Sequence, residues 1–316
     1  MQITDLSELK KYWPITEDLS LHRNVANLVY FSKIESQEIV IRLTPTSQRS
    51  SDEINAELQW MNDLKKNGLN IVEIILSNQS SLFHTLNIHG SEFHIMVMKK
   101  IEGTRADPDT LTIDILHQWS ATLALLHKNS KSIQSGLKRE TWNKDTIFLK
   151  SLSCIDSVGT QTKKLFQDAI QFVSSQTTGN NFGLIHGDLH TGNYFIHNNQ
   201  IIVFDFDDCC YHYFLYDLTI PVLSIYKMWD LADNISHKQD LINQFLENYF
   251  SYFEKPQNFK NIFKKFIQYR LLLVHYWLIA IRSERELSED SQKAFADAIK
   301  DDLYLAENLQ LFDFIQ

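Results

Sequence analysis

The order of apolar and polar residues predicts strands near the start of this chain and helices over most of the remainder. Residues 25–31 and 38–43 are rich in the β-branched, aromatic and other apolar residues typical of strands, and the polar stretch 33–37 between them predicts a turn. An apolar stripe at helical spacing follows the capping candidates at 50–52 and stops at Gly68. Its members are Ile54, Leu58, Met61 and Leu64. The pattern therefore predicts two paired strands and then a helix.

Helical spacing of apolar residues dominates after residue 113. The apolar face of the first of these helices consists of Leu116, Trp119, Leu123 and Leu126. Residues 93–98, before it, predict a buried strand. The longest apolar stretch, 271–281, is interrupted by His275 and is shorter than the roughly 20 residues that cross a bilayer. We therefore expect a buried helix there and no membrane insertion.

The strongest chemical signal lies in the middle of the chain. Asp188 falls in a loop that contains glycines, Asn193 follows it, and Asp205 comes after a predicted hairpin of residues 194–196 and 201–204. A carboxylate within reach of a hydroxyl can position it and accept its proton. Mg²⁺ prefers oxygen ligands and keeps some waters, so Asn193 and Asp205 are suitable ligands for it. Together the three residues predict a phosphoryl-transfer site with Asp188 as the base.

The motif around Asp188 carries a family resemblance. His-Gly-Asp-Leu-His-x-Gly-Asn at 186–193, followed by Val-Phe-Asp-Phe-Asp-Asp at 203–208, resembles the aminoglycoside phosphotransferase and choline kinase superfamily. The resemblance implies an α+β protein kinase-like fold with two lobes. A nucleotide-binding lobe of residues 1–98 would contain a five-stranded antiparallel sheet and one helix. A larger, mainly helical lobe of residues 99–316 would carry the catalytic and substrate-binding residues.

The same resemblance gives roles to residues around the base. His186 would hold the catalytic loop together, and His190 could approach the transferred phosphate. Asp217 matches an Asp that braces this loop through its backbone amides, a role compatible with helix N-capping. Asp207 and Asp208 could assist the metal or bind substrate. The implied cofactors are ATP and Mg²⁺.

The implied nucleotide site departs from protein kinases in two ways. Arg42 is the basic residue of its predicted strand, where protein kinases use Lys, and Glu57 on the following helix is its expected partner. Glu53, one turn earlier, is the alternative partner. The stretch 21–27 lacks the glycines of a phosphate-covering loop. By position, the hinge whose backbone would contact adenine includes Val97, Met98, Lys99 and Lys100.

Composition agrees with two globular cores and excludes some partners. The chain has 316 residues, of which 44% are hydrophobic and 22% are charged. A formal net charge of −9 speaks against a nucleic-acid binder, which needs a basic face. Three cysteines without metal-ligand spacing, and an N-terminus without a basic segment and apolar run, favour a reducing cytoplasm. We expect a monomer or a homodimer.

The sequence leaves the acceptor hydroxyl open. A small molecule is favoured, such as an aminoglycoside, choline or a homoserine-like compound. However, residues 266–278 resemble the bacterial stress-response kinase A subgroup, which implies protein Ser/Thr as another acceptor. The aromatic residues of this stretch could instead bind a quaternary amine. Two other classes stay open: a nucleotide-binding pseudokinase, and a metal-dependent hydrolase that uses His186, Asp188 and His190.

Overall fold

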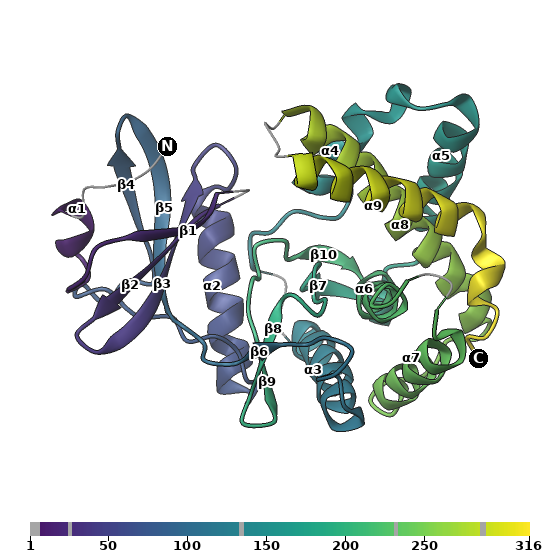
Figure 1. The fold of residues 1–316 in the computed structure, drawn as a ribbon, viewed down its shortest axis with the longest axis horizontal. Coiled ribbons are helices and arrows are strands. Elements are labelled where there is room, and N and C mark those ends of the chain that lie inside the picture. The colour runs from purple at the N-terminus through teal and green to yellow at the C-terminus, as the bar shows by residue number, and fades with distance from the viewer. Residues whose placement is uncertain (1–6, 25–26, 133–135, 231–232, 285–288) are drawn as a thin grey trace. The chain divides into compact units, whose positions relative to one another are not determined.

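The chain folds into two compact units (Figure 1). Unit one contains Met1–Arg105, Ser135–Arg139 and Tyr194–Asp207, and unit two contains the other residues. The predicted lobe boundary at residue 98 does not include the later segments that join unit one. The computed structural model describes residues 7–24, 27–132, 136–230, 233–284 and 289–316.

Unit one is built on a five-stranded antiparallel sheet with the strand order β1-β2-β3-β5-β4. The register places Arg42 opposite Met96, and Val40 opposite Met98. Because side chains alternate between the two faces of a strand, these four residues share one face of the sheet. The strands are β1 (Ser20–Asn24), β2 (Leu28–Ile34), β3 (Gln37–Pro45), β4 (His84–Ile88) and β5 (Ser91–Lys99).

The other face of this sheet carries the main core of unit one. The N-terminal helix α1 (Ser7–Lys10) and the residues after it place Leu9, Trp13 and Ile15 against this face. Trp13 donates from its indole nitrogen to the carbonyl of Ile75 over 3.0 Å, so its one polar atom is satisfied. The buried residues of the sheet include Tyr30, Ile39, Ile41, Leu43, Ile95 and Val97.

Helix α2 (Ser51–Lys66) confirms the helix that the sequence predicts. The Ser50 side chain accepts a hydrogen bond from the Glu53 amide, and the Glu53 carboxylate accepts one from the Ser50 amide, which is a capping box. Gly68, with φ of +85°, follows the last turn. All four predicted stripe residues are buried. Figure 1 shows α1 and α2 on opposite sides of the five-stranded sheet.

A second sheet explains why residues 194–207 belong to unit one. Strands β6 (Thr104–Arg105), β8 (Tyr194–His197) and β9 (Gln200–Val203) form a three-stranded antiparallel sheet in the order β6-β8-β9. Asn198 and Asn199 form the turn with positive φ angles, as a two-residue hairpin turn requires. This confirms the predicted hairpin, and its pairing with β6 ties it to the first part of the chain.

Unit two is mainly helical around a two-stranded antiparallel sheet. This sheet pairs β7 (Phe182–Ile185) with β10 (Cys210–Tyr213). Helices α8 and α9 lie side by side (Figure 1). The helices are α3 (Ile113–Ser132), α4 (Thr146–Ser153), α5 (Thr160–Ser174), α6 (Phe214–Tyr226), α7 (Ile235–Phe250), α8 (Phe259–Glu284) and α9 (Glu289–Glu307). Short 3₁₀ turns cover Ile155–Ser157, Gly179–Asn181 and Leu309–Phe312.

The longest apolar stretch is part of α8, and most of its side chains are buried. Its interrupting residue, His275, is also buried and donates from Nδ1 to the carbonyl of Ile299 on α9 over 2.8 Å. The helix predicted there is therefore confirmed as a core helix. In the part of the chain that the structure describes, no helix combines the length and the apolar character needed to cross a membrane.

Candidate active site

The candidate base lies in a loop of unit two that needs a glycine. Strand β7 ends at Ile185, and Gly187 follows with φ of +83°, a conformation that other residues rarely adopt. A Cβ atom on Gly187 would also collide with the backbone carbonyl oxygen of Asp208. Two separate constraints therefore require glycine directly before Asp188.

The catalytic loop is held by a buried carboxylate on α6. Asp217 accepts hydrogen bonds from the backbone amides of His186 (3.2 Å) and Gly187 (3.0 Å). His127 donates to Asp217 from Nε2 over 3.0 Å, and its Nδ1 accepts from the Tyr249 hydroxyl over 2.7 Å. Burial, the largest influence on His127, keeps its pKa below the ordinary value, so the neutral ring suits this pattern. These buried contacts fix the backbone of the loop.

Three side chains surround the carboxylate of Asp188. Its Oδ1 accepts from Arg270 Nη2 (3.1 Å), its Oδ2 accepts from Asn193 Nδ2 (3.0 Å), and His190 Nε2 lies 3.4 Å from Oδ2. Burial acts to raise the pKa of Asp188, but the hydrogen bond and charge of His190, with the charge of Arg270, hold it below its usual range. The carboxylate is therefore ionised at neutral pH and can accept a hydroxyl proton.

Arg270 on α8 is a site residue that sequence reasoning missed. Its Nη1 donates to the Tyr216 hydroxyl over 2.7 Å and to the carbonyl of Gly187 over 3.3 Å. These contacts orient the guanidinium that binds Asp188. The available signal was a charged residue at the start of a long apolar stretch, which needs a partner when it is buried. The sequence does not show which partner that is.

Asn193 has the geometry of an oxygen ligand for a cation. Its Nδ2 donates to both the backbone carbonyl (2.8 Å) and the carboxylate (3.0 Å) of Asp188. With its amide hydrogens used in this way, Oδ1 is the atom left for a metal ion. Amide oxygens are ligands that Mg²⁺ and Ca²⁺ accept. The orientation of Asn193 therefore fits a divalent cation.

The two histidines of the loop have different environments. His186 is fully buried, and its Nδ1 accepts from the amide of Asp188 over 3.3 Å. The His190 side chain is 41% exposed, and its Nδ1 accepts from the amide of Gly192 over 2.9 Å.

Among the described residues, no group of three His, Cys, Asp or Glu side chains could hold a metal ion. The hydrolase alternative has no support in that part of the structure.

Unit one contains the predicted pair of Arg42 and Glu57. Arg42 Nη2 donates to the Glu57 carboxylate over 2.7 Å, and both side chains are buried. Burial acts to lower the pKa of Arg42, but nearby carboxylates, Glu57 first, raise it overall. Arg42 Nε is buried without a hydrogen-bond partner among the described residues. Buried donors normally have partners, and a phosphate oxygen would satisfy this one.

Asp205 follows β9 in a strained backbone conformation. Its φ is +65°, which lies in the left-handed region and is uncommon for a residue other than glycine. Strain of this kind is concentrated at functional sites, where the surrounding structure maintains it. Asp205 also belongs to unit one, as does Arg42, whose charge its carboxylate stabilises.

Asp207 lies in an arginine cluster of unit one. Its Oδ1 accepts from Arg49 Nε over 3.4 Å, and its Oδ2 accepts from Asn27 over 3.2 Å. Its backbone carbonyl accepts from Arg49 (3.0 Å) and from Arg139. Burial acts to raise the pKa of Asp207, but Arg42, Arg49 and Arg139 hold it below its usual range. These contacts, which sequence reasoning missed, give Asp207 a structural role.

Several backbone groups of the predicted hinge already have hydrogen-bond partners. Val97 accepts a backbone hydrogen bond, and Lys99 and Lys100 each donate one, all within unit one over 2.8–3.0 Å. Fewer backbone groups therefore remain for adenine than the sequence suggests. The partners of these hinge groups are Ile75, Glu73 and Glu38. Val25 and Ala26 of the phosphate-covering stretch lie outside the described residues.

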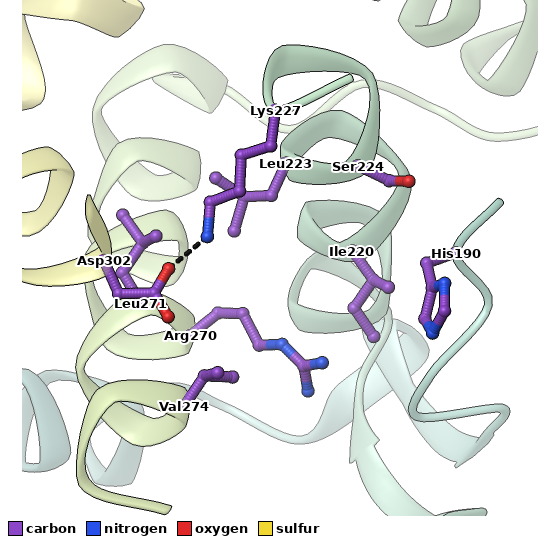
Figure 2. Close-up of a pocket in the computed structure, with 9 residues that line it drawn as sticks. All are labelled: His190, Ile220, Leu223, Ser224, Lys227, Arg270, Leu271, Val274 and Asp302. Atoms are coloured by element: carbon purple, nitrogen blue, oxygen red, sulfur yellow. Dashed lines mark hydrogen bonds and ion pairs between the residues drawn. The ribbon is translucent and has the colours of Figure 1, made fainter. Parts of the chain in front are cut away.

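A pocket with a volume of about 240 Å³ opens in unit two beside the base (Figure 2). His190 and Arg270, which both contact Asp188, form part of its wall. Apolar side chains from α6 and α8 form much of the rest, and Lys227 and Asp302 add charges. The apolar residues are Ile220, Leu223, Leu271 and Val274.

Comparison with known proteins decides the family. Residues 19–250 match the model of the phosphotransferase enzyme family, which is well over half of the chain. The chain belongs to this family. This membership confirms the predicted family resemblance and the predicted enzyme class, a kinase that transfers phosphate to an alcohol group.

Individual relatives of this phosphotransferase are distant but extend over nearly its whole length. The amicoumacin kinase of Bacillus subtilis (strain 168) is 24% identical over 299 residues, which cover 91% of this chain and 87% of that protein. A solved amicoumacin kinase in complex with AMP-PNP, Ca²⁺ and Ami has a TM-score of 0.80 at 22% identity and covers 94% and 91% of the two chains. A microcompartment-associated aminopropanol kinase has a TM-score of 0.75 at 20% identity and covers 99% of both. These likenesses confirm the predicted α+β kinase-like fold.

Proposed function

We propose that this phosphotransferase moves the γ-phosphate of ATP, with Mg²⁺, to a hydroxyl of a small molecule. The observation that carries the proposal is the ionised carboxylate of Asp188 beside a pocket of about 240 Å³. A pocket of this size suits a small acceptor, and the apolar part of its wall keeps water away from the reacting hydroxyl. The amicoumacin and aminopropanol kinases have acceptors of this class by name.

Each unit supplies its own residues to this proposed reaction. In unit two, Asp188 accepts the hydroxyl proton, and Asn193 offers an oxygen to the metal. In unit one, Asp205 is the second metal ligand, and Arg42, oriented by Glu57, binds nucleotide phosphates. A divalent metal would neutralise phosphate charge in such a site, and the amicoumacin kinase complex with AMP-PNP and Ca²⁺ supports this role.

We also assign roles to the other predicted site residues of each unit. His190, which is exposed beside the base, would stabilise charge on the transferred phosphate. Residues 97–100 would contact adenine through the backbone groups that the sheet leaves free. His186 and Asp217 hold the loop and do not touch substrate.

Turnover of ATP with Mg²⁺ and pooled acceptors tests this function. The pools contain amino alcohols, aminoglycosides and a generic protein substrate. We expect turnover with a small-molecule pool, a fall in kcat of about 100-fold or more in Asp188→Asn, and retained nucleotide binding in that variant. Asp205→Asn should lose the Mg²⁺-dependent part of the thermal stabilisation by ATP.

Asp114→Asn, which changes an exposed carboxylate of α3, is the matched control and should behave as the wild type. Nucleotide-dependent stabilisation without turnover in every pool would support the pseudokinase alternative. Equal turnover in the wild type and Asp188→Asn would exclude Asp188 as the base. Phosphorylation of the protein pool alone would exclude a small-molecule acceptor.

A further inference from the structure

Asp302 is a carboxylate that the pocket wall buries almost completely. It lies on α9, and its side chain is 2% exposed. Among the described residues its ion-pair partner is the ammonium of Lys227, whose side chain is 33% exposed. Burial is the largest influence on Asp302 and raises its pKa, against the charges of Lys227, Arg270 and His275. The pocket therefore contains a buried anion covered by a partly exposed cation.

Lys227 reaches this carboxylate on a flexible stem. It is the C-cap of α6, and Figure 2 shows its side chain extending from the end of that helix to Asp302. A lysine ammonium is a compact charge on four rotatable methylenes. Removing it without a substitute would leave a buried charge unpaired, which is strongly unfavourable. Exchanging it for another ammonium keeps Asp302 neutralised.

The pocket as a whole has the chemistry to bind a small amino alcohol. Figure 2 shows His190 and Asp302 at opposite ends of the pocket. His190 and Arg270 contact the base, so this end suits the reacting hydroxyl. The apolar side chains of α6 and α8 between the two ends suit a hydrocarbon body. A molecule with a hydroxyl at one end and an ammonium at the other would fit both ends.

We propose that the Lys227 ammonium fills a binding site for the acceptor's ammonium group, and that the primary ammonium of the acceptor displaces it from Asp302. This proposal rests on the function proposed above. Lys227 is therefore an intramolecular competitor of every amine-bearing acceptor for the carboxylate of Asp302. A neutral alcohol cannot replace its charge and so leaves the pair in place. The subsite thereby selects hydroxyl compounds that carry a primary ammonium.

Matched pairs of probes test this exchange. The amines are linear amino alcohols of three to six carbons with the two groups at opposite ends, and each is paired with the diol of the same length. Dissociation constants are measured by calorimetry without nucleotide, so that the result does not depend on catalysis. In the wild type we expect an amino alcohol to bind at least tenfold more tightly than its diol.

Variants of the ion pair separate displacement from other roles. Lys227→Met removes the competitor while keeping side-chain length, so we expect amino alcohols to bind at least fivefold more tightly and diols to be unaffected. Asp302→Asn should abolish the preference for the amine. Lys163→Met is the matched control, because Lys163 is 34% exposed and also forms an ion pair, with Asp156. Weaker or unchanged amine binding in Lys227→Met would overturn the proposal.

A measurement on the wild-type protein covers the case in which a variant does not fold. Reductive methylation of Lys227, normalised to Lys163 in the same sample, should rise at least twofold when the bound amino alcohol releases the lysine, and should not change with the diol. No rise at saturating amino alcohol, or no amine binding at all, would overturn the proposal. A different result would count against the proposed function alone: the probes bind as expected, but ATP is not consumed with any acceptor.

Discussion

Asp217 holds the backbone of the catalytic loop through a buried carboxylate. Its carboxylate accepts from the amides of His186 and Gly187 and from the ring of His127, all in the core of unit two. Asp217→Ala leaves these donors without an acceptor, at about 1–3 kcal/mol for each buried group. We expect the free energy of unfolding in urea to fall by about 3 kcal/mol or more. The kcat should also fall at least tenfold, because the base loses its support.

Thr219→Ala is the control for this loss. Thr219 is fully buried on the same helix, and among the described residues its hydroxyl donates only to the carbonyl of Tyr216 in that helix. Its removal should cost about 1 kcal/mol and leave kcat nearly unchanged. Equal losses of kcat in both variants would contradict a positioning role for Asp217.

At the residue scale, the family resemblance gave roles to residues that lie in its motifs or at matching positions. Asp217, Asn193 and the pair of Arg42 and Glu57 belong to this group. In the structure Asp217 accepts from the catalytic loop, Asn193 donates to Asp188, and Arg42 pairs with Glu57. Arg270 does not belong to this group. Its contact with Asp188 joins residues 82 positions apart, and nothing in the sequence of α8 shows which acid it meets.

At the scale of elements, the turn between β7 and the catalytic loop has the sharpest requirement. Gly187 has a positive φ, and a side chain there would also meet the carbonyl of Asp208. Gly187→Ala should therefore lower the free energy of unfolding by clearly more than the roughly 1–2 kcal/mol of left-handed strain alone. It should also lower kcat at least tenfold. Urea unfolding and turnover with the best acceptor measure both effects.

Gly68→Ala supplies the comparison, because the chain offers a second glycine with nearly the same φ in open surroundings. Gly68 has φ of +85°, and a Cβ atom there would meet no other atom within 4 Å. It should lose only the strain energy and keep full activity. If the two variants were equally destabilised, steric exclusion at Gly187 would not be the cause.

Helices and strands with clear local signals in the sequence could be predicted. Which of them pair with one another could not. The capping candidates at 50–52 and the apolar stripe predicted α2, and the Asn198-Asn199 turn predicted the hairpin of β8 and β9. The pairing of that hairpin with β6 depends on residues about 90 positions apart, Thr104 and Ile196. Local patterns carry no information about such partners, so they do not show that residues 194–207 join unit one.

At the scale of the whole molecule, histidines that are wholly or partly buried link stability to pH. Burial is the largest influence on four histidines and lowers the pKa of each below its ordinary value of 6.5. Below about pH 6.5 the unfolded chain therefore binds protons that the folded chain does not, and the free energy of unfolding falls as pH falls. The carboxylates of Asp188 and Asp207 also have lowered pKa values, and they reduce the free energy of unfolding only at lower pH, below their ordinary pKa of 3.8. The four histidines are His84, His94, His127 and His212.

His212 should account for a measurable share of this pH dependence. It is buried, lies stacked on Tyr216 at 3.9 Å between ring centroids, and has a pKa well below the ordinary value through burial and the charge of Arg270. His212→Gln should reduce the slope of unfolding free energy between about pH 6 and pH 5 by up to about 1.4 kcal/mol per pH unit, the value for one proton. Urea titrations at each pH measure the slope. Leu149→Gln, at an exposed residue that does not titrate, should keep the wild-type slope. If His212→Gln also kept it, the folded protein would be taking up that proton at His212, against the burial of the ring.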